Sequence, residues 1–386
     1  MSTIEILPAQ LGEYYQAMTK AHGSPLLLLD RDKVRLRYRE LCEALPSVEL
    51  YYAMKSQCEP AFLEVLIAEG AGIDIATNGE IAILQQLQQR PKQLIHTHPF
   101  KKDADIRAAL DFDCNTFVVD CVEELDKFAA YADKVELLLR VSCQNSAAKI
   151  DLSKKFGCPE ASVASVLDEA RRRGLKVKGL SFHVGSQCGS ADMHVDAITL
   201  CARFFSSHPY LTCLDIGGGF PAPYDETVVN LIDFCAPIRT ALQQLDSRIR
   251  VIAEPGRCLS APCFYSVATI MGAAAAEKAQ WYFLDDGVYG SFSGAFYSGN
   301  RYPLQVFSDA APQCNTVLAG PTCDSVDVIY ENVMLPKLAV DDVVVGPCMG
   351  AYTTVTASEF NAIAKPKLLI RDGHIEAVKQ LQASQS

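Results

Sequence analysis

The stretch VELYYAMKSQ, residues 48–57, decides how the chain is organised. Its first seven residues are apolar, aromatic or β-branched for the most part, a pattern typical of a buried strand. The strand ends at Lys55, which places an amine at the rim of a sheet. Neighbouring Tyr51, Tyr52 and Met54 would desolvate that amine and favour its neutral form, a nucleophile toward an aldehyde. Taken alone, the stretch favours an ordinary solvated lysine, because most lysines lie on the surface.

Apolar strand-like runs alternate with helical patterns from this point onward. The eight runs are Val48–Met54, Gly72–Ala76, Gln93–His96, Thr116–Asp120, Val135–Val141, Val177–Val184, Leu211–Ile216 and Val251–Glu254. A helical pattern follows every run except the last, which predicts a parallel sheet with right-handed crossovers. Eight such units over roughly 200 residues match a closed (β/α)8 TIM barrel. A doubly wound open sheet is the alternative fold for this half.

The alternation stops after Glu254. Segments such as CFYSVATIMGA and KLAVDDVVVGPC, with DDG, DD and RDG turns between the strands, indicate a mainly β region. One short helix is expected near Ser358. We therefore predict an α/β protein with a barrel in residues 25–260 and a mainly β domain formed by residues 261–386 together with 1–24.

Composition excludes several classes of function. The net charge of -11 and the pI near 5.2 come without a basic cluster, which argues against nucleic acid and anionic membranes as partners. No export signal is visible and no apolar run reaches the ~18 residues of a membrane span, so a cytoplasmic protein is expected. The fifteen cysteines lack CxxC pairs and metal-ligand spacing, which predicts reduced thiols without a metal site.

Polar residues and glycines fall at the predicted carboxyl ends of the strands, where barrels of this kind hold their active sites. They are Lys55, Asp74, Arg140, His183, Ser186, Gly217, Gly218, Gly219, Glu254, Gly256 and Arg257. A glycine-rich turn can cradle a phosphate, and Arg257 would add a charged fork. Buried Glu254 needs a cation such as a protonated ring nitrogen, while His183 offers a flat face and Lys55 an amine. Each residue alone has an ordinary structural explanation, but together they describe a site for pyridoxal 5′-phosphate (PLP).

The sequence resembles the ornithine/lysine/diaminopimelate/arginine decarboxylases of PLP fold type III, which join an alanine-racemase-like barrel to a β domain. The matching motifs span nearly the whole chain and agree best with the ornithine and lysine branch: YYAMKS, GIDIATNGEI, LLRVS, SFHVGSQ, LDIGGGFP, AEPGR, DDGVYGSFSG, GPTCDSVD and MGAYTTVTASEFN. The resemblance implies PLP-dependent α-decarboxylation of an L-diamino acid to the amine and carbon dioxide. Polyamine biosynthesis is the pathway that it suggests.

The resemblance also assigns roles around the cofactor. Lys55 would bind the cofactor aldehyde, Glu254 would keep the pyridine nitrogen protonated and His183 would stack on the ring. The phosphate would be held by Ser186, Gly217, Gly218, Gly219, Arg257 and Tyr352, and Gly256 is a further cofactor-binding position. Other positions close to the cofactor match Asp74, Glu80 and Arg140.

A second set of roles concerns the substrate. In GPTCDSVD, Cys323 would protonate the substrate carbon after carbon dioxide leaves, and Asp324 would meet the far end of the substrate. Tyr297 and Phe360 match further substrate-binding positions. In the family, Cys323 and Asp324 reach into the partner subunit's site, so the resemblance implies a homodimer with two shared sites.

One departure from the family pattern concerns substrate choice. The ornithine/lysine branch carries an acidic residue directly after the position of Tyr297, but here that position is Ser298, and Arg301 lies three residues further on. Losing a carboxylate and gaining a cation would weaken the grip on a terminal ammonium. The substrate is then either a free diamino acid or one whose far end is modified or carries a carboxylate. A racemase, a non-catalytic family member and a PLP-carrying housekeeping barrel are further alternatives.

Overall fold

The computed structural model describes residues 4–143, 155–224, 230–276 and 278–372. The chain divides into two compact units. Unit 1 comprises Met1–Val34, Ala222–Thr227 and Ser260–Ser386, and unit 2 comprises Arg35–Pro221 and Val228–Leu259. The first division falls within helix α2 (Arg31–Ala44).

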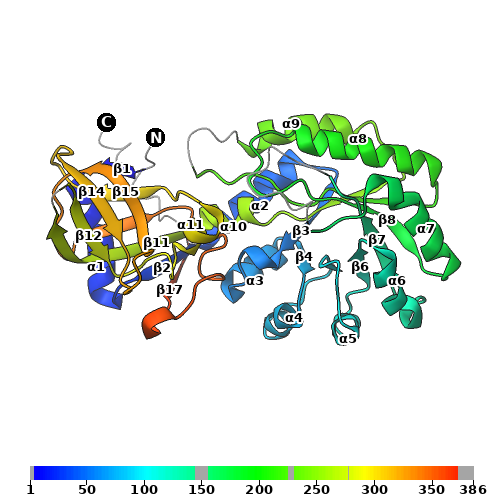
Figure 1. Ribbon diagram of the computed structural model, residues 1–386, viewed down its shortest axis with the longest axis horizontal. Helices are drawn as coiled ribbons and strands as arrows, with labels where there is room; N and C mark the ends of the chain where they lie inside the picture. The colour runs from blue at the N-terminus through cyan, green and yellow to red at the C-terminus, as the bar shows by residue number, and fades with distance from the viewer. Residues whose placement is uncertain (1–3, 144–154, 225–229, 277, 373–386) are drawn as a thin grey trace. The chain divides into compact units, whose positions relative to one another are not determined.

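Unit 2 is a closed barrel of parallel strands in the order β10-β3-β4-β5-β6-β7-β8-β9 (Figure 1). Its strands are β3 (Val48–Ala53), β4 (Gly72–Ile75), β5 (Leu94–His96), β6 (Thr116–Val119), β7 (Glu136–Arg140), β8 (Val177–Ser181), β9 (Cys213–Asp215) and β10 (Arg250–Ala253). Each strand lies within or close to one of the eight predicted runs. The pairing of β10 with both β3 and β9 closes the sheet, which confirms the barrel and excludes the open sheet.

Helices connect successive strands and surround the barrel (Figure 1). They are α3 (Pro60–Ala68), α4 (Asn78–Gln85), α5 (Asp103–Asp111), α6 (Val122–Phe128), α7 (Val163–Arg172), α8 (Asp192–Ser207) and α9 (Leu231–Leu242). The helical pattern predicted from Val228 begins outside the described residues. The expectation that no helix follows the eighth strand is wrong, because the chain turns at Gly256 into α10 (Arg257–Ser260), which is too short to show an apolar period.

The barrel interior is filled by one apolar layer. Six buried side chains from six different strands form a single cluster there: Tyr51, Ile95, Val118, Leu138, Cys213 and Ile252. Successive side chains on a strand point to opposite faces, so residues two positions apart share a face. The next inward position on each of these strands therefore lies one layer closer to the carboxyl end of the barrel.

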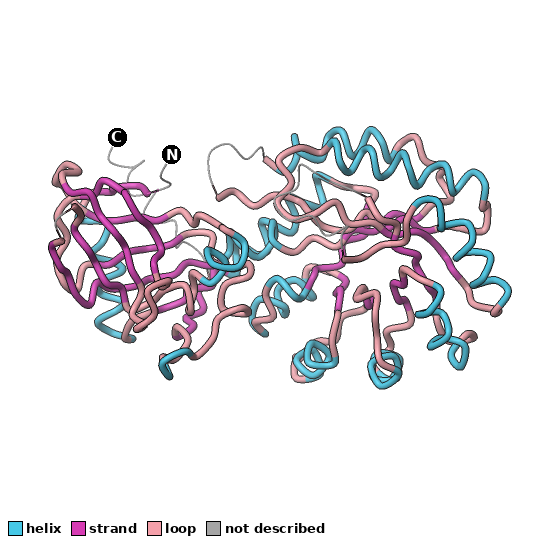
Figure 2. The backbone as a smooth tube through the Cα atoms, in the orientation of Figure 1, coloured by secondary structure: helices cyan, strands magenta, loops and turns pink. Residues whose placement is uncertain are grey.

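Strands are the main regular elements of unit 1, as the tube drawing shows (Figure 2). Its strands are β1 (Ile4–Leu7), β2 (Leu26–Asp30), β11 (Phe264–Ala275), β12 (Gln280–Leu284), β13 (Leu304–Phe307), β14 (Cys314–Ala319), β15 (Val328–Leu335), β16 (Val343–Gly346) and β17 (Lys367–Arg371). They form one sheet with the order β1-β13-β16-β11-β12-β14-β15, to which β2 is added at β11 and β17 at β2. Helix α1 (Ala9–His22) packs Tyr15 and Met18 into the core formed by β2, β11 and β16.

The expected start of the barrel at residue 25 needs correction. Strand β2 pairs antiparallel with β11 and parallel with β17, so its four leucines are buried in the sheet of unit 1 and not in the barrel. An isolated apolar run carries no signal for which sheet it joins. Unit 1 also holds α11 (Ser293–Ser298), which the sequence did not predict because SGAFYS has no helical apolar period, in addition to η5 (Phe360–Ala362) near Ser358.

Two further features bear on the class of protein. All fifteen cysteines carry free thiols. None of the helices in the described part of the chain combines the length and the apolar character needed to cross a membrane.

Candidate active site

A polar layer lies inside the barrel, directly above the apolar one. The alternation of β-strand side chains places the following residues there: Asp74, Thr97, Asp120, Arg140, Ser181, Asp215 and Glu254. Two hydrogen bonds tie neighbouring strands together across this layer, from Thr97 Oγ1 to Asp74 Oδ1 at 2.6 Å and from Ser181 Oγ to Asp215 Oδ2 at 3.2 Å. Four of the seven groups are buried acids, which is a costly arrangement without a cation.

Lys55 stands beside two of these acids. It lies in the 3₁₀ turn η1 (Met54–Ser56) that follows β3, and its Nζ is 3.4 Å from Asp74 Oδ2 and 4.0 Å from Glu254 Oε2. The side chain is 41% exposed, so the expected desolvation by its tyrosine neighbours is not found. Tyr51 instead fills the barrel interior, and Tyr52 donates to the carbonyl of Gln57. The setting of the amine is therefore ionic.

Three of the four buried acids, Asp74, Asp215 and Glu254, share too little positive charge. Burial raises the pKa of Asp74 to about 7, with Lys55 opposing the rise and Glu254 adding to it. Burial also raises the pKa of Glu254 well above its usual value, and the neighbouring carboxyl of Asp215 raises it further. Arg140 is the other cation near Glu254, and burial lowers the pKa of its guanidinium. The layer is thus suited to receive one more cationic group.

The loop after β9 forms a cradle of backbone. A Cβ atom on Gly217 would lie 2.2 Å from the carbonyl oxygen of Phe182, and one on Gly219 would lie 2.8 Å from that of Gly185. Gly217 and Gly219 also have positive φ angles of 64° and 101°. Within the described ranges, the N–H groups of Gly218 and Gly219 donate to no protein atom, whereas that of Gly217 donates to Asp215 Oδ1 at 2.9 Å. Two adjacent unpaired N–H groups are the donors that an anion needs.

Arg257 and Ser186 lie together near this end of the barrel. The Nε and Nη2 atoms of Arg257 are 3.4 and 3.3 Å from Ser186 Oγ. Arg257 is buried at the start of α10, directly after Gly256, where a Cβ would lie 3.1 Å from that of Ser56. A buried guanidinium and a hydroxyl are further groups that a phosphate would bind.

His183 faces the same glycine loop. A Cβ on Gly218 would lie 3.1 Å from its Nε2, so only glycine leaves the ring room at this point. Its Nδ1 accepts the N–H of Gly185 at 3.1 Å. Burial lowers the pKa of His183 well below its usual value, and the positive charges of Arg140 and Lys55 lower it further. The imidazole is therefore neutral and fixed, as a stacking surface should be.

Glu80 caps the helix that follows β4. Its Oε2 accepts the N–H groups of Ala76 and Thr77 at 2.5 and 3.1 Å, and Thr77 caps α4 in return. This capping box fixes the loop that follows β4, and with it Asp74. The carboxylate acts on the backbone and supports the site from outside.

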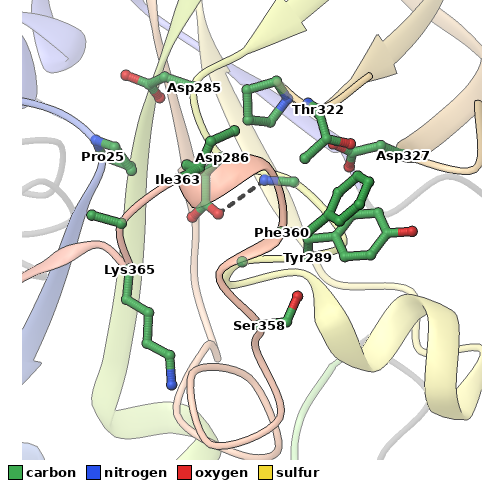
Figure 3. A pocket seen from close by; sticks show the side chains of 14 residues that line it. Pro25, Asp285, Asp286, Tyr289, Thr322, Asp327, Ser358, Phe360, Ile363 and Lys365 are labelled. Carbon is green, nitrogen blue, oxygen red and sulfur yellow. Dashed lines mark hydrogen bonds between the residues drawn. The ribbon is translucent and has the colours of Figure 1, made fainter. Parts of the chain in front are cut away.

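Unit 1 carries a second cluster, around Cys323 and Asp324. The phenol of Tyr289 donates to Asp324 Oδ2 at 2.5 Å, which lowers the pKa of Asp324 and raises that of Tyr289 to about 12. The Tyr289 ring stacks on Phe360 with 4.7 Å between centroids (Figure 3). Cys323 is exposed, and its N–H donates to Asn361 Oδ1 at 3.0 Å. A thiol and an ionised carboxylate therefore occupy adjacent positions of one loop.

Asp327 fixes the shape of that loop. Asp327 lies beside Thr322 (Figure 3), and its Oδ2 accepts both the N–H and the hydroxyl of Thr322, at 3.0 and 2.7 Å. Its Oδ1 accepts the N–H of Val288 at 2.8 Å. A Cβ on Gly287 or Gly320 would lie 2.3 or 2.2 Å from Asp327 Oδ1. The buried carboxylate therefore joins the GPTCDSVD loop to the DDGVYG turn.

The remaining predicted residues lie elsewhere on unit 1. Tyr297 is 66% exposed near the end of α11, and Ser298 ends that helix with a side chain outside the described part of the structure. Arg301 lines a groove of about 470 Å³ together with Ser325, the neighbour of Asp324. Tyr352 has a positive φ of 53° in the loop after β16.

Several residues that make hydrogen bonds in or around these clusters were not predicted from the sequence. They are Thr97, Asp215, Tyr289, Asp327, Asn361 and His194. Asp215, Tyr289, Asp327 and Asn361 lie inside motifs that the sequence analysis quoted, so their positions were available. His194 lies in none of them.

The residues present suit PLP. The unpaired N–H groups of Gly218 and Gly219 and the guanidinium of Arg257 suit its phosphate, and the acid layer with raised pKa values at Glu254 suits a protonated ring nitrogen. Lys55 would supply the amine for the aldehyde. Among the described residues, no group of three or more His, Cys, Asp or Glu could hold a metal ion.

Comparisons with known proteins agree with this reading. The family model described as "Pyridoxal-dependent decarboxylase, pyridoxal binding domain" matches residues 31–261. The lysine/ornithine decarboxylase of Selenomonas ruminantium is 34% identical over 365 residues, which is 92% of each chain. The ornithine decarboxylase of Caenorhabditis elegans is 31% identical over 393 residues, covering 94% of this chain and 92% of its own.

Solved structures give the same placement. The lysine/ornithine decarboxylase of Vibrio vulnificus, crystallised with putrescine, is 45% identical with a TM-score of 0.89, covering 95% of this chain and 99% of its own. The Paramecium bursaria Chlorella virus arginine decarboxylase bound to agmatine is 27% identical with a TM-score of 0.87, covering 93% and 100%. The family predicted from the motifs is therefore confirmed: this chain belongs to the PLP-dependent decarboxylases of fold type III.

Proposed function

We propose that this enzyme removes the α-carboxyl group of an L-diamino acid of the ornithine or lysine type, releasing carbon dioxide and the diamine. The observation that carries the proposal is the loop on which Cys323, a proton donor, adjoins Asp324, a carboxylate kept ionised by Tyr289. Such a carboxylate suits the terminal ammonium of a diamino acid. Similarity to lysine/ornithine decarboxylases supports the same substrate class.

Each residue of the barrel site has one task. PLP, when bound, supplies an electron sink for the charge left on the α carbon as carbon dioxide departs. Lys55 Nζ attaches the cofactor, Glu254 holds a proton at the ring nitrogen and His183 supports the ring face. The glycine loop, Ser186, Arg257 and Tyr352 anchor the phosphate. Cys323 Sγ then delivers a proton to the α carbon, while Asp324 holds the far end of the substrate.

The substrate screen that tests this proposal uses purified protein with added PLP. Ornithine, lysine, arginine, diaminopimelate, diaminobutyrate and their ω-acylated forms are incubated separately, and products are identified by mass spectrometry. We expect putrescine from ornithine or cadaverine from lysine, with a Cys323→Ala variant at least tenfold slower. Formation of the D-amino acid without loss of carbon dioxide would instead make the enzyme a racemase.

We also propose that two copies of the chain form a dimer in which Cys323 and Asp324 serve the partner's barrel. Cys323 is exposed on unit 1. Unit 1 also carries four exposed apolar side chains, at sequence positions before and after Cys323: Phe296, Tyr297, Val326 and Phe360. Exposed aromatic and apolar side chains are typical of protein interfaces. The reduced thiols also suit a cytoplasmic location.

Subunit mixing tests the shared site. Lys55→Ala and Cys323→Ala are each expected to abolish most activity, but in a dimer with sites shared between subunits every mixed dimer regains one intact site. Random exchange of equal amounts should then restore about a quarter of wild-type activity. No recovery after verified exchange would place both residues of each site in one subunit.

A carboxylate-bearing or ω-modified diamino acid is a second candidate substrate, favoured by Arg301. This exposed cation lines the same groove as Ser325, next to Asp324 in the sequence, and the acid of the ornithine/lysine branch is replaced by Ser298. In this case Arg301→Met should slow turnover of the acidic substrate, and Ser298→Asp should speed turnover of free ornithine or lysine. Unchanged rates for both free diamino acids in Ser298→Asp would contradict this second candidate.

A further inference from the structure

His194 lies directly behind the glycine cradle. It belongs to the first turn of α8 and is fully buried. Its Nε2 lies 3.0 Å from the carbonyl oxygen of Gly218. None of the residues assigned to PLP binding is His194, so the contact between His194 and Gly218 is not explained by those assignments.

The contact fixes where the imidazole carries its proton. A carbonyl oxygen only accepts, so Nε2 must be the protonated nitrogen and Nδ1 the bare one. Nδ1 is buried without a hydrogen-bond partner among the described residues. The ring stacks on Phe220 at 5.1 Å and meets the edges of Phe234 and Phe182 at 6.0 and 6.4 Å. A second proton would place a charge among three aromatic rings, and burial accordingly lowers the pKa of His194 to about 4.

Holding the Gly218 carbonyl sets the orientation of a whole peptide group. In a trans peptide the C=O and the following N–H point in opposite directions. With the Gly218 oxygen bound to His194, the N–H of Gly219 must point away from α8. That N–H is one of the two unpaired donors of the cradle. Glycine has no Cβ, so its own dihedral angles restrict the orientation of this peptide less than those of another residue would.

We propose that His194 is a positioning residue for PLP, one that holds the Gly218–Gly219 peptide with its N–H directed at the cofactor phosphate. The inference rests on the proposed role of the glycine loop in phosphate binding. Its effect is preorganisation: the donor is aimed before the cofactor arrives, so binding does not have to order the loop. The aromatic packing of the ring keeps the histidine in place but contributes nothing to this aim.

Two substitutions separate the hydrogen bond from the packing. His194→Phe keeps an aromatic ring in the cage and removes the donor, whereas His194→Gln restores an N–H close to the position of Nε2. We expect the dissociation constant for PLP to rise about three- to tenfold in the Phe variant, the worth of one lost neutral hydrogen bond, and to recover in the Gln variant. The ³¹P resonance of the bound phosphate should move in the Phe variant only. His208→Phe, near the end of the same helix, is the matched control and should bind PLP normally.

The measurements are equilibrium titration of the PLP-free protein by absorbance and ³¹P NMR of the loaded protein. Wild-type affinity and an unchanged ³¹P resonance in His194→Phe would overturn the proposal. Arg257→Ala tests the phosphate site independently of His194. If this variant also binds PLP normally, the phosphate site itself is misassigned.

A folding defect in the Phe variant would not remove the test. Imidazole ¹⁵N spectra of the wild-type protein report the tautomer of each of its seven histidines. We expect His194, assigned by its loss in His194→Gln, to be neutral and protonated at Nε2 from pH 6 to 8. A neutral ring that carries its proton on Nδ1 would rule out the hydrogen bond to Gly218 and with it the proposed role.

Discussion

At the scale of single residues, the phenol of Tyr289 governs how Asp324 meets its ligand. The hydrogen bond from Tyr289 is the main cause of the lowered pKa of Asp324. Tyr289→Phe should raise that pKa toward its usual value, so the carboxylate of Asp324 would become protonated at a higher pH than in the wild type. We expect KM for the diamino acid to begin rising at a higher pH than in the wild type, with kcat less affected. The pH profiles of both constants measure this, and Phe360→Leu controls for loss of the ring stack.

The buried acid Asp74 makes a prediction about stability. Its pKa is near 3.8 in the unfolded chain and about 7 in the fold, because burial dominates. Between these values the unfolded state has lost a proton that the folded state retains, so rising pH favours unfolding. The PLP-free protein should therefore lose more stability between pH 5 and pH 7.5 than Asp74→Asn does, by on the order of 2–3 kcal/mol. Urea unfolding of both proteins at the two pH values tests this, and equal losses would refute it.

At the scale of elements, closure of the barrel depends on Gly179 in β8. A Cβ at this position would lie 2.0 Å from the carbonyl oxygen of Cys213 in the adjacent β9. Gly179→Ala should therefore force the two strands apart and cost about 3 kcal/mol or more, since the obstacle is backbone. Gly189→Ala is the control, because nothing lies within 4 Å of the added carbon. The urea midpoints of the two variants provide the comparison; similar midpoints would mean that β8 can shift without loss.

At the scale of the whole molecule, the proposed dimer predicts that assembly and PLP binding are separable. Phe296 is 62% exposed on α11 and suits an apolar interface. Phe296→Glu should produce monomers and lower turnover at least tenfold, because the barrel would lose the partner's Cys323. It should still bind PLP, because Lys55, the glycine loop and Arg257 belong to its own barrel. Sedimentation together with a PLP titration checks this, with Phe100→Glu on the barrel as the control for an added surface charge. A fully active monomer would contradict the shared site.

The sequence by itself determined the barrel and most of the residues around its rim. Eight apolar runs with intervening helices allow few other topologies, and period-two alternation brings Asp74, Arg140 and Glu254 into one inward layer. The motifs were sufficient to identify the family, because each combines a residue type with a specific strand end or turn. These features are local, so the chain order alone encodes them.

Only the tertiary structure decided features that depend on pairing across long sequence separations. It assigned β2 to unit 1, through its pairing with β11, although the sequence placed it in the barrel. It showed the Lys55 amine next to carboxylates, with its tyrosine neighbours directed elsewhere. It also placed His194 against Gly218, 24 residues away. No local pattern encodes such contacts, since they arise when strands and helices remote in sequence pack into one core.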